Sequence, residues 1–217
     1  MSQESEREAR LRMVAEQIVK RGVRDEHVLA ALRTVPRHRF VPAELREQAY
    51  EDRPLPIGHE QTISQPYIVA AMSEALELRG GERVLEVGCG SGYQAAVLAE
   101  LAGEVVSVER VAPLAERARA LLAELAYRNV EVVLADGSLG HPARAPYDAI
   151  LVACGASEVP PALLDQLAPG GRLVLPVGPQ GGVMRLERWR RGEAGASRTD
   201  DLMGVRFVPL LPGTATS

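Results

Sequence analysis

Residues 83–101, RVLEVGCGSGYQAAVLAEL, decide the fold of this chain. The run Val84–Val87 is short and β-rich, and it leads into three glycines, Gly88, Gly90 and Gly92, before a helical pattern begins. In doubly wound sheets, a glycine turn between the first parallel strand and its helix lies at the carboxyl edge of the sheet, where ligands bind. The stretch therefore predicts an α/β fold with a nucleotide-type ligand at this turn.

The residues that follow repeat the alternation of strand and helix. We expect strands at 104–109, 130–134, 147–152 and 172–177, and helices at 93–101, 113–127 and 160–167. Such alternation implies right-handed crossovers and a parallel sheet. The tail differs, because stretches 184–190 and 204–210 flank a polar region and predict an antiparallel hairpin. The predicted fold class is a doubly wound, Rossmann-like α/β sheet, mostly parallel, with a C-terminal antiparallel hairpin.

The residues before this sheet predict a helical extension. Residues 11–18 carry apolar side chains at helical spacing, and Asp25 can cap a second helix that ends before Pro36. Residues 37–58 contain three prolines and predict an irregular, ordered connector with a short helical piece. Helical spacing resumes at 66–78, where a proline in the first turn costs little.

Composition fits one cofactor domain with such an extension. The 217 residues are 46% hydrophobic and 25% charged, which excludes disordered and fibrous classes. The 20 glycines and 15 prolines exceed what an all-helical bundle tolerates. We place the extension at 1–80 and the cofactor-binding domain at 81–217.

Charge and cysteine usage limit the partners and the compartment. A net charge of −4 with scattered basic residues gives no field that attracts nucleic acid. Cys89 and Cys154 are too few for a disulfide framework and are not spaced as a metal pair, so we expect a reducing cytoplasm and no metal. The first twelve residues have no apolar signal core, and no uncharged run reaches a membrane span, so we expect neither secretion nor a membrane partner.

Three carboxylates near strand ends indicate which cofactor the glycine turn holds. The G-x-G-x-G spacing differs from the G-x-G-x-x-G of dinucleotide folds, and Glu86 just before the turn would repel a pyrophosphate but accept from an ammonium group. Glu109 ends the second strand, where a carboxylate can bind both ribose hydroxyls. Asp136, followed by Gly137, ends the third and can accept from an adenine amino group. Together they describe S-adenosyl-L-methionine, which has an ammonium group and no phosphate.

Other interpretations of these residues stay open at this point. Each carboxylate alone is typical of a solvated or capping residue, and a lone glycine motif is often a tight turn without a ligand. A protein that binds the cofactor without catalysis would use the same fold, because fold alone does not give activity.

A second motif lies in the extension, and it resembles segments of a known protein family. Residues 58–66 read GHEQTISQP, and residues 35–42 read VPRHRFVP. Both resemble segments of the protein-L-isoaspartate(D-aspartate) O-methyltransferases, in which Gly-x-x-x-Thr-Ile-Ser-x-Pro precedes the cofactor domain. The resemblance continues through most of the chain, including 84–93, 135–137, 146–150, 167–173, 176–179 and 204–210.

The resemblance implies a function and a set of site residues. It implies a class I methyltransferase sheet and methyl transfer from S-adenosyl-L-methionine to the free carboxylate of L-isoaspartyl residues in damaged proteins, which starts their repair. It makes Ser64 the active-site serine, and it places Gln61, Thr62 and Ile63 along the cofactor and substrate cleft. It implies isoaspartyl proteins and peptides as partners, and we expect a monomer. The alternative for Ser64 is a helix N-cap, since Pro66 opens the next helix.

The remaining alternatives concern the acceptor. The segment after the fourth strand, 153–161, lacks the Asn/Asp-Pro-Pro-aromatic loop typical of nucleic-acid amino methylation. A methyltransferase for a small molecule or nucleic acid, or a non-catalytic cofactor-binding regulator, remains the competing hypothesis. Val183, Met184 and Leu211 depart from the common family pattern, which puts substrate contacts from the C-terminal segment in doubt and should leave the cofactor site intact.

Overall fold

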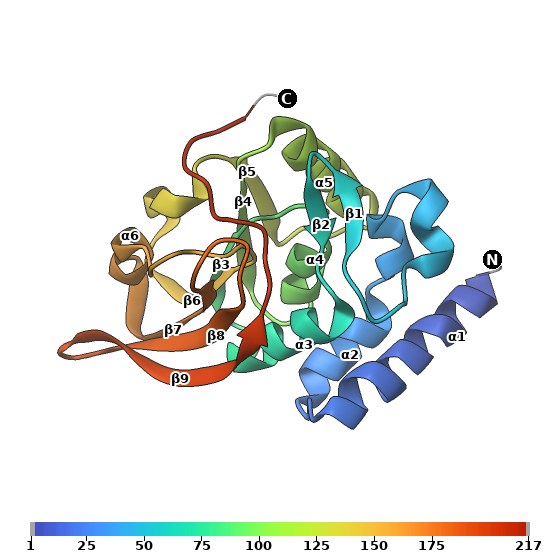
Figure 1. Cartoon of the computed structure of the whole chain (residues 1–217), viewed down its shortest axis with the longest axis horizontal. Helices are drawn as coiled ribbons and strands as arrows, with labels where there is room; N and C mark the ends of the chain where they lie inside the picture. Colours follow the sequence, from blue (N-terminus) through green and yellow to red (C-terminus); the bar gives the residue numbers. More distant parts are fainter. Residues whose placement is uncertain (1–2, 216–217) are drawn as a thin grey trace.

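The computed structural model describes residues 3–215, and within them a seven-stranded sheet lies at the centre (Figure 1). The strand order is β5-β4-β3-β6-β7-β8-β9. The strands are β3 (Arg83–Val87), β4 (Glu104–Glu109), β5 (Val130–Leu134), β6 (Tyr147–Val152), β7 (Leu167–Val177), β8 (Met184–Gly192) and β9 (Gly195–Val205). Strands β3 to β7 pair in parallel, whereas β8 and β9 pair antiparallel, which confirms the predicted fold class. The chain order reverses at β3, so the glycine turn lies at the switch point where doubly wound sheets bind ligands.

Both faces of the sheet are buried, which is why its central strands are mostly apolar, with Glu86, Ser107 and Glu109 as buried polar residues among them. Val84 packs in a cluster that also holds Leu32 and Leu76 of the extension, whereas Leu85 and Val87 pack in a second cluster. The helices that contribute to these clusters from the cofactor-binding part are α4 (Tyr93–Ala99), α5 (Ala112–Glu124) and α6 (Pro161–Asp165). The extension thus shares one core with the sheet.

The extension is helical, as predicted. Its helical segments are α1 (Gln3–Met13), η1 (Val14–Ile18), η2 (Val19–Arg21), α2 (Glu26–Thr34), η3 (Arg37–Phe40), η4 (Ala43–Gln48) and α3 (Pro66–Ala75). The Asp25 cap is confirmed, because its carboxylate accepts from the backbone N–H groups of His27 (2.9 Å) and Val28 (3.3 Å). Pro66 lies in the first turn of α3, where its missing N–H is tolerated.

One part of the predicted connector is wrong. The last residues expected to be irregular form strand β1 (Leu55–Gly58), which pairs antiparallel with β2 (Gln61–Ile63), a stretch for which no element was predicted. The turn between them places His59 and Glu60 at φ 53° and 57°. Tight hairpin turns with positive φ usually use Asn-Gly or Asp-Gly, so His-Glu gave no turn signal in the sequence. This small sheet carries Gln61 to Ile63 toward the ends of the large sheet.

The second strand of the C-terminal hairpin is also misplaced in the prediction. The structure puts β9 at Gly195–Val205, not at 204–210, and Gly192 pairs directly with Gly195. Strand β9 is an edge strand with mostly exposed or half-exposed side chains, so its polar sequence shows no apolar alternation. The apolar residues after Val205 instead leave the sheet and run toward the ends of β3 to β5, as the red segment in Figure 1 shows. Strand β7 likewise begins at Leu167, earlier than the predicted residue 172, and shortens the preceding helix.

None of the helices between residues 3 and 215 has the length and apolar content needed to cross a lipid bilayer.

Candidate functional site

The glycine turn is built from residues with left-handed backbone conformations. Gly88, Gly90 and Gly92 have φ values of 91°, 54° and 86°, which side chains with a Cβ rarely adopt. The N–H of Gly88 donates to the carbonyl of Val108 at 2.9 Å, so the turn folds back over the end of β4. These contacts place the turn beside Glu109, the second of the three carboxylates predicted near strand ends.

Glu109 ties the turn to the end of β4. Its side chain is 5% exposed; one carboxylate oxygen accepts from Gly90 N (2.7 Å) and the other from Val111 N (2.9 Å). Glu109 also lines a cleft with Gly88, Gly90 and Gly137, which we call the glycine-loop cleft. A carboxylate oxygen has more than one lone pair, so both oxygens can still accept from a ligand.

Glu86 lies behind the turn rather than in the cleft. It is fully buried, and one oxygen accepts from the Ser107 hydroxyl while Oε1 has no hydrogen-bond partner among residues 3–215. Burial raises the pKa of Glu86 from 4.5 to about 8, and the hydrogen bond from Ser107 only partly opposes this. The protein therefore contains a neutral carboxyl group next to the glycine turn at neutral pH, with one unpaired oxygen.

This carboxyl group predicts a pH dependence of stability. Between about pH 5 and about pH 8 the folded protein keeps the Glu86 proton while the unfolded chain has lost it, so the free energy of unfolding falls as pH rises, by about 1.4 kcal/mol per pH unit. Replacing Glu86 by glutamine should remove that slope. Urea unfolding of both proteins across this window tests it, and equal slopes would contradict the buried neutral state. Burial lowers the pKa of His38 below its ordinary value, but His38 is present in both proteins, so its contribution cancels in the difference.

Asp136 lies at the end of β5 with both of its oxygens occupied. It accepts from Ser138 N (2.9 Å), from the Ser138 hydroxyl (2.6 Å) and from Gly213 N (2.6 Å). Burial disfavours its ionisation, but these hydrogen bonds outweigh burial and lower the pKa of Asp136. The adjacent Gly137 lines the glycine-loop cleft, and a Cβ there would clash with Val87.

The C-terminal segment, residues 208–215, lies across the glycine-loop cleft. Gly155 N donates to Val208 O (2.8 Å) and Leu210 N donates to Gly155 O (2.7 Å), which fixes the segment over the end of β6. Further on, Arg110 Nε donates to Gly213 O at 3.0 Å. With the segment in place the cleft holds ≈ 60 Å³, well below the roughly 300 Å³ of a small-molecule pocket.

The sequence interpretation missed several residues of this cleft. Ala153 and Cys154 follow β6, and the rule that ligands bind at the carboxyl ends of parallel strands would have included them. Arg110 gave no signal, because its partner Gly213 is far away in the sequence. Leu211 also lines the cleft, so the expectation that this departure leaves the cofactor site untouched is wrong.

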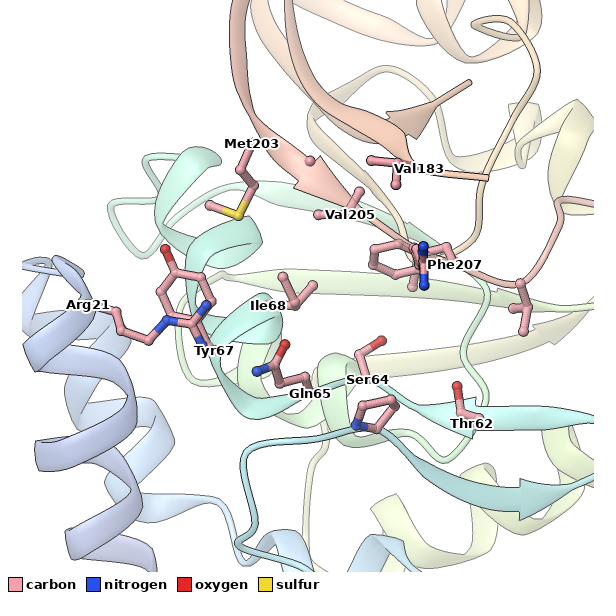
Figure 2. A pocket seen from close by; sticks show the side chains of 15 residues that line it. Arg21, Thr62, Ser64, Gln65, Tyr67, Ile68, Val183, Met203, Val205 and Phe207 are labelled. Atoms are coloured by element: carbon pink, nitrogen blue, oxygen red, sulfur yellow. The ribbon is translucent and has the colours of Figure 1, made fainter. Parts of the chain in front are cut away.

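A second, wider cleft of ≈ 580 Å³ adjoins the first (Figure 2). We call it the Ser64 cleft; Figure 2 shows Thr62 and Ser64 on one wall, opposite Val205 and Phe207. Thr62, Ala153 and Val208 line both clefts and so form the junction between them.

Ser64 is free to act in this cleft. The N-cap of α3 is Gln65, and no side chain caps that helix, so the alternative role of Ser64 as a helix cap is wrong. Within residues 3–215 no protein group is hydrogen-bonded to the Ser64 hydroxyl, although the side chain lines the cleft. Gln61 lines the glycine-loop cleft, whereas Ile63 is 3% exposed and packs in the core behind.

Departures from the family pattern occur on the far wall as well. Val183 lines the Ser64 cleft and is 59% exposed, while Met184 is buried and fills the space that a side chain at Gly155 would need. Val183 precedes β8 and forms part of the wall opposite Ser64, whereas Met184, the first residue of β8, lies in the core.

Comparisons with known proteins agree with this geometry. Residues 8–215 match the family model described as Protein-L-isoaspartate(D-aspartate) O-methyltransferase (PCMT). The chain is 59% identical to protein-L-isoaspartate O-methyltransferase 1 of Rhodopseudomonas palustris over 93% of this chain and 82% of the relative, and 56% identical to the Methanoculleus marisnigri enzyme of that name over 94% and 92%.

Two solved structures share the fold. One, a protein-L-isoaspartate O-methyltransferase, has a TM-score of 0.79 and 31% identity, covering 94% of this chain and 65% of its own. The other, from Plasmodium falciparum, is described as a protein-L-isoaspartate O-methyltransferase in complex with S-adenosyl-L-homocysteine; it has a TM-score of 0.80 and 26% identity, covering 93% and 98%. The glycine turn, the two joined clefts and these likenesses together show that the chain belongs to the protein-L-isoaspartate(D-aspartate) O-methyltransferase family.

Proposed function

We propose that this protein transfers a methyl group from S-adenosyl-L-methionine to the free carboxylate of L-isoaspartyl residues in damaged proteins and peptides, as the first step of their repair. The observation that carries the proposal is the Ser64 hydroxyl, which has no hydrogen-bond partner in the described part of the chain. It lies in a wide cleft joined to the glycine-loop cleft at Thr62, Ala153 and Val208. A peptide in the Ser64 cleft and a cofactor in the glycine-loop cleft can therefore approach each other at this junction.

The residues of the glycine-loop cleft suit this cofactor. Gly88 and Gly90 allow close approach of the backbone, and Glu109 presents a carboxylate to the cleft wall, where it can accept from the ribose hydroxyls. The Asp136 carboxylate, next to Gly137, can accept from the adenine amino group. Glu86 is buried and neutral behind the turn and lines neither cleft, so its predicted role as acceptor for the ammonium group has no support in this geometry. Gln61, Thr62 and Gly137 complete the binding set.

For this reaction the protein chiefly has to align the two reactants. When bound, the cofactor supplies an electrophilic methyl group on a sulfonium. A substrate carboxylate with a pKa of about 4 is ionised at neutral pH, so no general base is needed to activate it. One carboxylate oxygen forms the new O–C bond while the C–S bond breaks and its electron pair stays on sulfur, and no proton moves. Holding the reactants in line can lower the barrier by on the order of 7 kcal/mol.

We assign the orienting role to Ser64. Its hydroxyl can donate to one oxygen of the substrate carboxylate and leave the other oxygen to attack. Thr62, in the preceding strand β2, lies at the junction of the two clefts, through which the methyl group passes.

A paired-peptide assay tests the activity. With radiolabelled S-adenosyl-L-methionine, we expect label in an isoaspartyl peptide and none in the same peptide with a normal aspartyl residue. Equal labelling of both peptides would contradict the assignment. Cofactor binding with no transfer to either peptide would favour the non-catalytic regulator, and transfer only to other components of a lysate would favour another acceptor.

We further propose that the protein acts as a monomer in a reducing cytoplasm, on protein rather than nucleic acid and without a membrane partner. Cys89 and Cys154 are free and buried, which fits a reducing compartment. Sedimentation equilibrium should give a mass near the 23.4 kDa of one chain, and a dimer mass would contradict the proposed state.

A further inference from the structure

The Ser64 cleft is lined by positively charged side chains, and the single reacting carboxylate of the expected substrate does not account for all of them. Among residues 3–215, its lining includes two arginines, Arg21 and Arg206, and no aspartate or glutamate. The protein as a whole carries a net charge of −4, so a cleft with cations alone does not follow from composition. The two arginines differ in what they contact within the protein.

Arg21 is already neutralised. Its guanidinium lies over the Tyr67 ring (Figure 2). It is 3.6 Å from the ring centroid, and Nη1 is 3.1 Å from the Asp52 carboxylate. Asp52 also accepts from the Gln65 side chain at 2.8 Å. Arg21 is therefore a fixed part of the cleft wall with its charge compensated.

Arg206 has a backbone held by its neighbours and a side chain without a partner among residues 3–215. It is exposed, and no hydrogen bond or ion pair joins it to any residue in 3–215. Its backbone is held on both sides, because Val205 pairs with Met184 at the end of β9 and Val208 is hydrogen-bonded to Gly155. An exposed guanidinium on a held stretch of backbone that lines the Ser64 cleft, with no partner among residues 3–215, is available to a ligand.

We propose that Arg206 is a specificity-determining residue that binds a second carboxylate of the substrate, next to the isoaspartyl residue. This inference rests on the proposed function, since it assumes an isoaspartyl peptide in the Ser64 cleft. The second carboxylate comes from an acidic side chain that flanks the isoaspartyl residue or from the C-terminus of the peptide. Both present the same group to the guanidinium fork.

The reacting carboxylate is a poorer partner for Arg206. A guanidinium that binds a carboxylate bidentately engages both of its oxygens and draws electron density from them, which would slow attack on the methyl group. The exposed position of Arg206 also puts it at the rim of the cleft, where a part of the peptide beyond the reacting residue passes. The neutral Ser64 hydroxyl remains the donor to the reacting group.

Matched isoaspartyl peptides test the proposal. One pair carries Glu or Gln beside the isoaspartyl residue, and a second pair has a free or an amidated C-terminus. The unmodified protein, Arg206→Gln, Arg206→Lys and the control Arg128→Gln are compared by kcat/KM and by peptide affinity from fluorescence anisotropy with S-adenosyl-L-homocysteine present. Arg128 is exposed and unpaired within the described residues and lines neither cleft.

The expected result is a preference of about two- to fivefold for the charged member of one pair, the range of an exposed ion pair. Arg206→Gln should abolish it, Arg206→Lys should keep part of it, and Arg128→Gln should keep all of it. Raising the salt from about 0.05 M to about 0.5 M should weaken it. The pair that shows the preference identifies the source of the carboxylate.

Two results would overturn the proposal: no charge preference in the unmodified protein, or an Arg206→Gln variant that retains it. A uniform loss on all peptides would make Arg206 a structural residue. Failure of methyl transfer to every isoaspartyl peptide would instead refute the proposed function, and the anisotropy ratios would still decide the role of Arg206.

Discussion

Replacing Ser64 by alanine is expected to lower kcat by about ten- to a hundredfold while cofactor affinity stays within about twofold. The change removes one hydrogen bond to a charged group, which is worth about 1.5–3 kcal/mol. The side chain lines the Ser64 cleft and caps no helix, so its loss should leave the fold intact. Single-turnover rates with saturating isoaspartyl peptide, together with calorimetry of S-adenosyl-L-homocysteine, measure the two effects separately.

Ser157 provides a matched control for this variant. It is exposed, forms no hydrogen bond within the described residues and lines neither cleft, so Ser157→Ala should behave as the unmodified protein. Normal turnover of Ser64→Ala at saturation, with cofactor binding lost, would refute the orienting role.

The second large effect concerns Glu109. Glu109→Ala should weaken binding of S-adenosyl-L-homocysteine by about ten- to a hundredfold, because the ribose loses its charged acceptor. The variant should also be less stable, since the N–H groups of Gly90 and Val111 lose their partner in a buried setting. Calorimetry and urea unfolding measure the two consequences.

The exposed Glu116 on α5 serves as the control, because Glu116→Ala removes a carboxylate that lines neither cleft. Unchanged cofactor affinity in Glu109→Ala would exclude the ribose role. Loss of stability alone would then make Glu109 a structural tie between the glycine turn and β4.

Local patterns in the sequence predicted the parts of the fold that depend on local physics. The glycine turn needs positive φ at three positions, and the buried strands need mostly apolar side chains on both faces. Both features can therefore be predicted from residues that are neighbours in the sequence. Glu109 was found because the end of a parallel strand falls at the ligand edge wherever the strand occurs.

The errors share a different cause, which is that distant parts of the chain set the local structure. Strand β9 is polar and is a strand because β8 pairs with it. The turn at His59 and Glu60 adopts positive φ without turn-forming residues, held by the pairing of β1 with β2. Asp136 binds Gly213, a partner 77 residues away that no spacing rule would suggest.

Val208 forms part of the wall of both clefts, and it belongs to the segment fixed over β6 by Gly155. Any displacement of this segment that widens the cofactor side also reshapes the peptide side. The two ligands are therefore thermodynamically linked: the factor by which bound cofactor changes peptide affinity must equal the factor by which bound peptide changes cofactor affinity. Binding of damaged protein would in this way change the affinity of the enzyme for its methyl donor.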